Sequence, residues 1–322
     1  MAVSQVPAAL VPKIWSKALW VEALKESYFE KFIGEDENSI IQRNTDLEKE
    51  PGDTVTFGLL MQLTGTGVDG DNVLEGNEES MVFYDMSVTI DQKRHGVRLA
   101  GLLAEQKSPY EMRNRAKNLL KNWLAQYRDK KFFSVLTASP SANRVLYAGG
   151  KTAENQITDN DKLTLDLISL AKRKAQLAKP MLRPVMVNGE PHFVAVFHPW
   201  QIRDLKSDAN YKDAVLNAAE RGKNNPLFTG AIAMWDGVII HEHPWVPITA
   251  TGATGANVGH GLFLGAQAAV EAVAKKMYWR EKAFDYDNQQ GFAIGIIHGV
   301  AKSKYNGEDF GCISILTGAK AE

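Results

Sequence analysis

The sequence lacks several features by which whole classes of protein are recognised. It has one cysteine, Cys312, in 322 residues, so no internal disulfide can form, as is usual in a reducing compartment. No stretch approaches the roughly 18 consecutive apolar residues of a membrane-spanning helix. The 37 basic and 38 acidic residues nearly cancel, whereas dedicated nucleic-acid-binding proteins usually carry a basic excess. These absences predict a globular protein made in a cytoplasm, long enough for about two domains.

The charges are unevenly distributed along the chain. No Lys or Arg occurs between Lys49 and Lys93, whereas this stretch holds nine acids. The remaining 29 acids (38 less these nine) stand against all 37 bases, an excess of eight positive charges. This segregation indicates either a solvated acidic surface or a surface that docks on a basic one. The nine acids are Glu50, Asp53, Asp69, Asp71, Glu75, Glu78, Glu79, Asp85 and Asp91.

The acidic stretch has the local pattern of a two-stranded ribbon. β-branched and aromatic residues at 54–57, 81–84 and 87–90 predict strands. The Gly-rich segment 64–71 between them predicts a turn. A two-stranded ribbon is only marginally stable alone in water, so we expect its own domain or another copy of the chain to cover it.

The rest of the chain mixes predicted helices and strands. The segment 108–111 has the sequence of a capping box and predicts a long, basic helix after it. The expected apolar stripe of that helix is Met112, Ala116, Leu119, Trp123 and Tyr127. Further helices are predicted over 13–33, 161–178, from about residue 200, and over 267–276, and strands over 192–197, 237–240, 262–264, 292–300 and 310–316.

Residues able to carry chemistry are few. His241 and His243 are two apart on a predicted strand and therefore face the same side, which would suit two ligands of a metal-dependent enzyme. No third ligand can be assigned from the sequence. A calcium loop is a weaker alternative, because Leu74 occupies the position where such a loop needs glycine. Its oxygen ligands would be Asp69, Asp71, Glu75, Asn77 and Glu78. We predict no catalytic residues, no cofactor and no metal.

Several blocks of the sequence occur in an order that resembles a known family. Together they are similar to the major capsid proteins of the N4-like family of tailed bacteriophages, from about Ile14 to Ile315. The blocks are Ser39–Ile41, Asp46–Phe57, Leu74–Glu79, Ile90–His95, Phe197–Gln201, Pro226–Gly230, Trp235–His243 and Leu264–Ala268.

The resemblance implies the α+β fold of tailed-phage major capsid proteins, the Hong Kong 97 type. The implied regions are an N-terminal arm at 1–40, an extended acidic β-loop at 41–92, a peripheral domain at 93–183, an axial domain at 184–276, and return strands of the peripheral domain at 277–322. The predicted helix near 163–178 would be the spine helix of the peripheral domain.

The implied function is structural rather than enzymatic. Pentamers and hexamers of the chain would form an icosahedral shell around double-stranded DNA, without sequence-specific binding and without a membrane. The protein would reside in the virion after synthesis in the bacterial host cytoplasm. A portal and a separate scaffold protein are expected partners, and a decoration protein is compatible with the resemblance. A compartment shell of the encapsulin kind, with protein cargo in place of DNA, is the alternative within the same fold.

The charge segregation then acquires an expected role, because in this fold the extended loop of one subunit lies over its neighbour. We expect the acidic loop to dock on basic positions of an adjacent subunit. The expected contact residues are Asp69, Asp71, Glu75, Glu78 and Glu79 on the loop and Lys172, Arg173 and Lys174 on the neighbour. The loop has no lysine between Lys49 and Lys93, so we expect no covalent cross-link through a loop lysine.

Overall fold

The computed structural model describes residues 27–48, 52–61, 63, 65–107, 112–187, 189–211 and 231–321. Its chain forms two compact units. The small unit contains Gln92–Tyr127 and Met277–Ile296, and the large unit contains Tyr28–Asp91, Arg128–Lys276 and Ile297–Glu322. None of the described helices combines the length and the apolar character that crossing a membrane requires.

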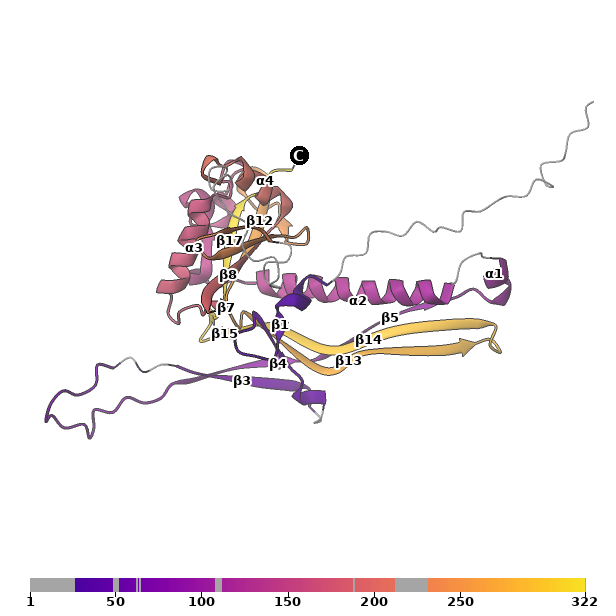
Figure 1. Ribbon diagram of the computed structural model, residues 1–322, viewed down its shortest axis with the longest axis horizontal. Coiled ribbons are helices and arrows are strands. Elements are labelled where there is room, and N and C mark those ends of the chain that lie inside the picture. Colours follow the sequence, from indigo (N-terminus) through magenta and orange to yellow (C-terminus); the bar gives the residue numbers. More distant parts are fainter. Residues whose placement is uncertain are drawn as a thin grey trace, which may run out of the picture. The chain divides into compact units, whose positions relative to one another are not determined.

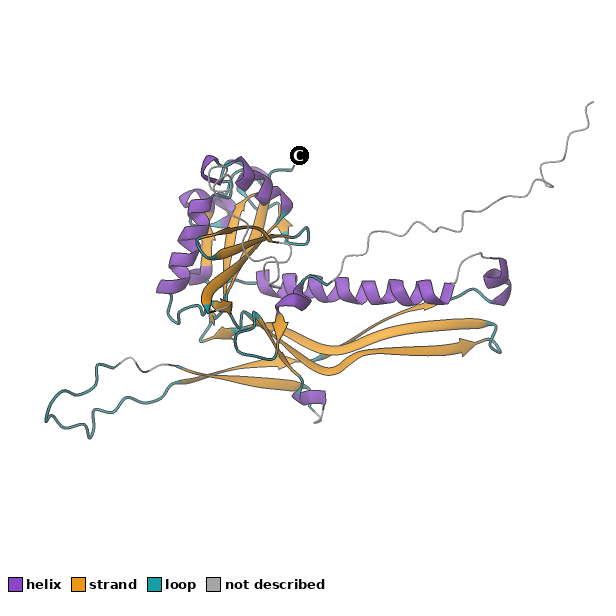
Figure 2. Ribbon diagram, viewed as in Figure 1, coloured by secondary structure: helices purple, strands orange, loops and turns teal. Residues whose placement is uncertain are grey.

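The strands form one five-stranded sheet, one eight-stranded sheet and two short ribbons (Figures 1 and 2). The five-stranded sheet has the order β1-β2-β13-β14-β5. Its strands are β1 (Ile33–Gly34), β2 (Ile41–Asn44), β13 (Ala269–Phe284), β14 (Gln289–Lys302) and β5 (Asp91–Arg98). Strands β13 and β14 and helix α2 (Met112–Thr137) each contribute residues to both units.

In the small unit, α2 packs on one face of the strands β5, β14 and β13. Its buried residues Ala116, Leu120 and Leu124 contact Phe292 and Ile294 of β14. The predicted apolar stripe is therefore partly wrong, because Leu119 is 55% exposed while Leu120 is buried. Spacing of four residues along α2 keeps one narrow face against the sheet. The short helix α1 (Leu102–Lys107) precedes α2.

The eight-stranded sheet is the centre of the large unit. Its order is β6-β17-β12-β8-β10-β9, with β11 added on β12 and β7 on β8. These strands are β6 (Val145–Tyr147), β7 (Val185–Val187), β8 (Glu190–Phe197), β9 (Ala231–Trp235), β10 (Val238–Glu242), β11 (Ile248–Thr249), β12 (Val258–Leu264) and β17 (Cys312–Gly318). β8 pairs parallel with β10 and antiparallel with β12.

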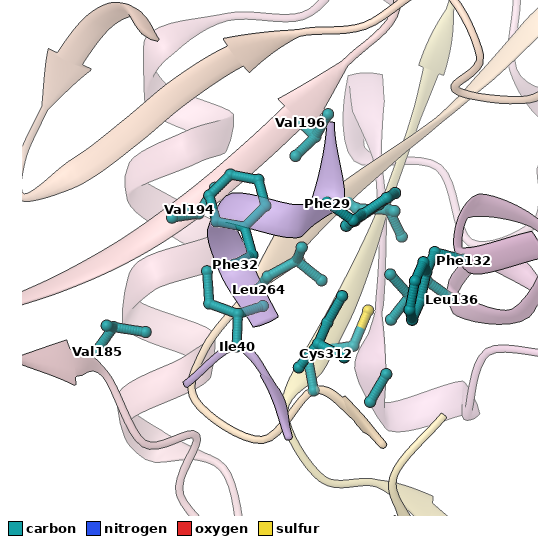
Figure 3. Packing of buried hydrophobic residues seen from close by; sticks show 14 of the residues in the cluster. Phe29, Phe32, Ile40, Phe132, Leu136, Val185, Val194, Val196, Leu264 and Cys312 are labelled. Atoms are coloured by element: carbon teal, nitrogen blue, oxygen red, sulfur yellow. The ribbon is translucent and has the colours of Figure 1, made fainter. Parts of the chain in front are cut away.

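Alternation along the strands divides the side chains of this sheet between two apolar clusters. Val194 of β8 lies in a cluster with Phe29, Phe32 and Phe132, as Figure 3 shows. Its neighbour Phe193 lies in the other cluster, with helices α3 (Leu165–Leu177) and α4 (Pro199–Ser207). Because both faces are covered, the strands read as continuous apolar runs rather than as alternating ones.

Two features of these regions differ from the expected arrangement. The Ala-rich segment 267–276 is not a helix but the start of β13, which pairs parallel with β2. Both faces of β13 are covered there: Ala269 lies in one apolar cluster and Val270 in another. A short run rich in alanine fits a buried helix or a buried strand equally well, and only its neighbours decide.

The second difference concerns the helix expected to be the spine. The helix in that position, α3, has 13 residues and packs on the eight-stranded sheet, whereas α2 has 26 residues. The eight-stranded sheet also joins β6, β8 and β17, which the implied regions 93–183, 184–276 and 277–322 would separate. The longest helix among the described residues is therefore α2, and the implied boundaries at 183 and 276 stay a prediction.

The predicted acidic ribbon is confirmed as a pair of antiparallel strands. β3 (Thr54–Leu60) pairs with β4 (Phe83–Thr89) from Thr54↔Thr89 to Leu60↔Phe83. Near its base, Met86 and Val88 are buried against Val270 of β13. The ribbon then leaves this support and continues into the segment 61–82 (Figure 1). A second small ribbon consists of β15 (Lys304–Tyr305) and β16 (Glu308–Asp309).

The central strand β12 provides a test of the sheet core. Phe263 is fully buried, with its ring centroid 5.0 Å from that of Phe193. We expect Phe263→Ala to lower the free energy of unfolding by about 3–5 kcal/mol, because it leaves a cavity between two covered layers. The matched control is Leu177→Ala, at a position on α3 that is 76% exposed. It should change the free energy of unfolding by less than about 0.5 kcal/mol. Denaturant unfolding measures both, and equal values would contradict the described packing.

Candidate assembly surfaces

The first surface is the acidic ribbon, residues 54–89. The five acids predicted to make contacts, Asp69, Asp71, Glu75, Glu78 and Glu79, all lie in its segment 61–82 and are exposed. Thus the structure brings the predicted acidic set together on one projecting segment. The basic positions predicted to make contacts, Lys172, Arg173 and Lys174, lie outside this ribbon.

The far end of the ribbon has defined local geometry. Asn77 N donates to the carbonyl of Leu74 at 2.9 Å and closes a turn, in which Gly76 has φ +88°. The Glu78 carboxylate accepts from Gly76 N at 2.7 Å, and the Glu79 carboxylate accepts from Gly65 N at 2.6 Å. Each carboxylate oxygen can accept more than one hydrogen bond, so these acids keep acceptor capacity for a partner.

The ribbon also exposes large apolar side chains. Seven of them are between 45% and 68% exposed, a density that monomeric proteins rarely leave uncovered. They are Leu60, Leu63, Val73, Leu74, Met81, Val82 and Phe83. Together with the acids they give this segment a surface that is both acidic and apolar.

The predicted basic positions lie next to one another on α3, but two of the three already have partners within the chain. Lys172 Nζ donates to the Asp236 carboxylate at 2.6 Å and to the Asp236 carbonyl at 2.7 Å. Lys174 Nζ donates to the Val145 carbonyl at 2.7 Å. Burial, and then the nearby Arg144 charge, lower the pKa of Lys174. Arg173 is exposed, so it is the member of the set best placed to meet another molecule.

His241 and His243 do face the same side, as predicted, but they lie in an aromatic core. The Tyr28 ring is 5.9 Å from His241 and 4.6 Å from His243, and Phe133 stacks on His243 at 4.8 Å. Lys31 Nζ lies 3.4 Å from His241 Nδ1, a position where a metal would meet a competing cation. Within the part of the chain that the structure describes, no three His, Cys, Asp or Glu side chains are grouped so as to hold a metal ion.

A buried ionic network joins several elements of the large unit. Glu271 of β13 is fully buried and accepts from Arg128 of α2 at 3.0 Å and from Arg43 of β2 at 3.1 Å. His298 Nδ1 of β14 lies 3.0 Å from the other carboxylate oxygen of Glu271. Glu30 completes the network through Arg128 at 2.8 Å and Arg43 at 3.4 Å. The network thereby ties the start of the described chain to α2 and to three strands.

The electrostatics of Glu271 follow from these contacts. Burial alone would raise the pKa of Glu271, but the hydrogen bond with His298 and the charges of Arg128 and Arg43 outweigh it and hold the pKa at about 2. Sequence reasoning missed this network, because its members are up to 268 residues apart (Glu30 to His298) and form no motif. The one local signal was an acid inside the apolar run 268–274, where a charge needs a partner.

An exposed ribbon that is both acidic and apolar, carried on a well-packed α+β body, is typical of a protein that associates with another molecule. The comparisons identify the class. The structure of the capsid of Ralstonia phage GP4 is similar, with a TM-score of 0.86, 33% identity and 99% of each chain covered. That of the cyanophage Pam1 capsid has a TM-score of 0.87 at 24% identity, with 100% of each chain covered. The predicted α+β tailed-phage capsid fold is thereby confirmed.

The chain belongs to the phage capsid protein family, whose model matches residues 5–321. A "Major capsid protein" of Pseudomonas phage KPP25 is 31% identical, covering 95% of this chain and 94% of that protein. The predicted resemblance is therefore confirmed, and the chain is a structural protein of a capsid shell.

The ionic network generates a stability prediction. We expect Glu271→Gln to lower the free energy of unfolding by about 3–5 kcal/mol, because it removes the buried counter-charge that Arg128 and Arg43 share and leaves them only the half-exposed Glu30. The matched control is Asp236→Asn, which breaks a partly exposed ion pair and should cost about 0–1 kcal/mol. Denaturant unfolding at neutral pH measures both variants. A Glu271→Gln variant as stable as the control would contradict a structural role for the network.

The same carboxylate predicts an acid dependence. The pKa of Glu271 is lower in the folded chain than its usual value of 4.5, so its contribution is fully present above about pH 4.5. It is lost as the pH falls towards 2, and a shift of this size corresponds to on the order of 3 kcal/mol. Unfolding measured between pH 5 and about pH 2 should therefore be less steeply pH-dependent in Glu271→Gln than in the wild type. Identical slopes would show that this carboxylate is not held ionised by its neighbours.

Proposed function

We propose that the chain is the major capsid protein of a tailed bacteriophage and that pentamers and hexamers of it form the icosahedral head shell around double-stranded DNA. The observation that carries the proposal is the likeness to the Ralstonia phage GP4 capsid over 99% of both chains. The exposed ribbon supports it independently, because its apolar side chains are best explained by burial against neighbouring copies.

The proposed shell has further partners. We propose that it confines DNA without sequence-specific contacts, in keeping with a net charge of −1. A portal and a separate scaffold protein are proposed to act during assembly. A decoration protein is compatible with the proposed shell. Synthesis in the bacterial host cytoplasm would precede incorporation into the virion. We propose no enzymatic activity for the chain itself, in keeping with its family.

Within the shell, we propose that the acids of the ribbon contact a basic surface of an adjacent copy. Exposed ion pairs contribute only about 0–1 kcal/mol each, so the charges would set register and association rate, while buried apolar area supplies the affinity. On α3, Arg173 is the exposed candidate, since Lys172 and Lys174 already have partners within the chain. The segment 61–82 contains no lysine, so this contact is proposed to stay non-covalent.

The function is tested by negative-stain electron microscopy of the purified protein, together with size-exclusion chromatography and light scattering. We expect uniform closed shells, or pentamers and hexamers that close into shells. A chain that stays monomeric or dimeric under all assembly conditions would contradict the proposal. Analysis of the contents of shells produced during infection separates the two shell functions: DNA supports the phage head, and protein cargo supports a compartment shell instead.

A further inference from the structure

Along residues 114–122, one side of helix α2 consists of asparagine and lysine alone. Five residues have the spacing i, i+3, i+4, i+7 and i+8, which places their side chains on one side of a helix. They lie away from Ala116, Leu120 and Leu124, which pack on the strands beside α2 (Figure 1). Asn122 is partly buried and the other four are exposed. We call this surface the Asn/Lys face: Asn114, Lys117, Asn118, Lys121 and Asn122.

The composition of the Asn/Lys face is not the one that best stabilises an exposed helix. Asparagine is among the poorer helix formers, because its amide competes for backbone hydrogen bonds. Lysine stabilises a helix most when an acid stands four residues before it, yet residues 112–127 hold four bases and no acid. In both respects the face gives up helix stability, which favours a role in binding over a role in solvation alone.

The charge of the face is not neutralised within the described residues. Neither Lys117 nor Lys121 forms an ion pair there. Glu281 of β13 pairs instead with Arg113 at 2.8 Å, and the charge of Lys117 has only a minor effect on that carboxylate. The acid of α2 itself, Asp129, is buried and accepts hydrogen bonds from two backbone amides. The two lysines are therefore available to an anionic partner.

The chemistry of the face discriminates between anionic partners. The acidic ribbon carries seven large exposed apolar side chains, and the Asn/Lys face offers them no apolar surface. The same face of a second copy would bring four lysines together without an acid, which is unfavourable. The phosphate oxygens of a nucleic acid accept hydrogen bonds both from lysine and from asparagine amides, and they need no apolar contact. Duplex DNA is the anionic polymer that the proposed shell encloses.

We propose that the Asn/Lys face contacts the phosphate backbone of the enclosed double-stranded DNA, an inference that rests on the proposed shell function. The face lines the inside of the shell in this arrangement. Residues 114–122 extend for about 12 Å along the helix, enough to follow several phosphates of one strand, which succeed one another about every 3.4 Å along the duplex axis. The lysines displace counterions, whereas the amides donate hydrogen bonds without adding charge.

Such a contact is weak in one copy and independent of base sequence. Phosphate contacts position a protein on the duplex but carry no sequence information, which suits a shell that encloses a whole genome. A shell repeats the contact in every copy, so the sum orders the adjacent DNA while each single contact can still be released. The near-neutral total charge of the chain then conceals a small basic surface at a defined place.

Equilibrium binding of DNA by the unassembled full-length protein tests the lysines. The probe is a fluorescent duplex of about 30 base pairs, followed by anisotropy at several salt concentrations. We expect Lys117→Gln/Lys121→Gln to weaken binding at low salt at least about tenfold and to reduce the slope of log affinity against log salt by about two. The matched control is Lys206→Gln/Lys320→Gln, at two exposed positions of the large unit, which should change the affinity less than about twofold. Equal loss in both double variants, or no binding by the wild type, would overturn the proposal.

Alanine substitutions test the amides without weakening the helix. Asn118→Ala/Asn122→Ala replaces poor helix formers by the best one, so a loss of DNA binding is not explained by unfolding of α2. We expect the affinity to fall about threefold while the salt slope stays unchanged, because no charge is removed. Circular dichroism verifies that the variant is folded. A face that serves solvation alone predicts a chain of equal or higher stability with undiminished DNA affinity, and that result would overturn the proposal.

Photocross-linking in DNA-filled heads identifies the partner of the face directly. A benzophenone amino acid takes the place of Asn118 in full-length chains produced during infection, and the same probe in place of Lys206 is the control. We expect the probe at position 118 to attach the chain to DNA, and the control to do so much less. Attachment to another protein chain instead, in heads that contain DNA, would overturn the proposal and indicate a second copy or a scaffold protein. A wild type that forms no DNA-filled heads would overturn the shell function itself, so the two failures are distinguishable.

Discussion

The buried carboxylate of Glu271 is the constraint on which the large unit depends. A charge with no exposed surface is very unfavourable unless it is paired and hydrogen-bonded, so its partners must be present together. Those partners come from α2, β2 and β14, and Glu30 brings in the segment before β1. Apolar packing alone tolerates small shifts of strand register. Hydrogen bonds to one shared carboxylate tolerate fewer such shifts, because each donor must keep its position. The network therefore specifies how these elements meet as well as stabilising them.

The large unit combines two surfaces of opposite physical character. Its eight-stranded sheet is covered by apolar side chains on both faces, since Val194 and Phe193 of one strand lie in separate apolar clusters. Its ribbon is the reverse, because beyond the buried base at Met86 and Val88 it exposes acids and apolar side chains together. The first surface is closed by contacts within the chain. The second acquires its full contacts only in an assembly, which is the behaviour expected of a subunit that forms a closed shell.

Charge complementarity within the chain is informative only when the availability of each charge is known. A count of charges treats Lys172, Lys174, Arg98 and Lys282 alike. Lys172 and Lys174 already donate to oxygen atoms of the same chain, whereas Arg98 and Lys282 lie 4.3 Å and 5.1 Å from the centroid of the Phe284 ring.

The sequence by itself determined the α+β class, the acidic ribbon, most of the elements and the capsid family, because these depend on local periodicity, turn residues and ordered blocks. Only the tertiary structure decided that 269–276 is a strand, since its partner in β2 is more than 200 residues away. It also assembled the Glu271 network from a helix, three strands and the segment of Glu30, which are distant in sequence. Such sites have no local pattern, because the pairing of strands, rather than the order of residues, brings their members together.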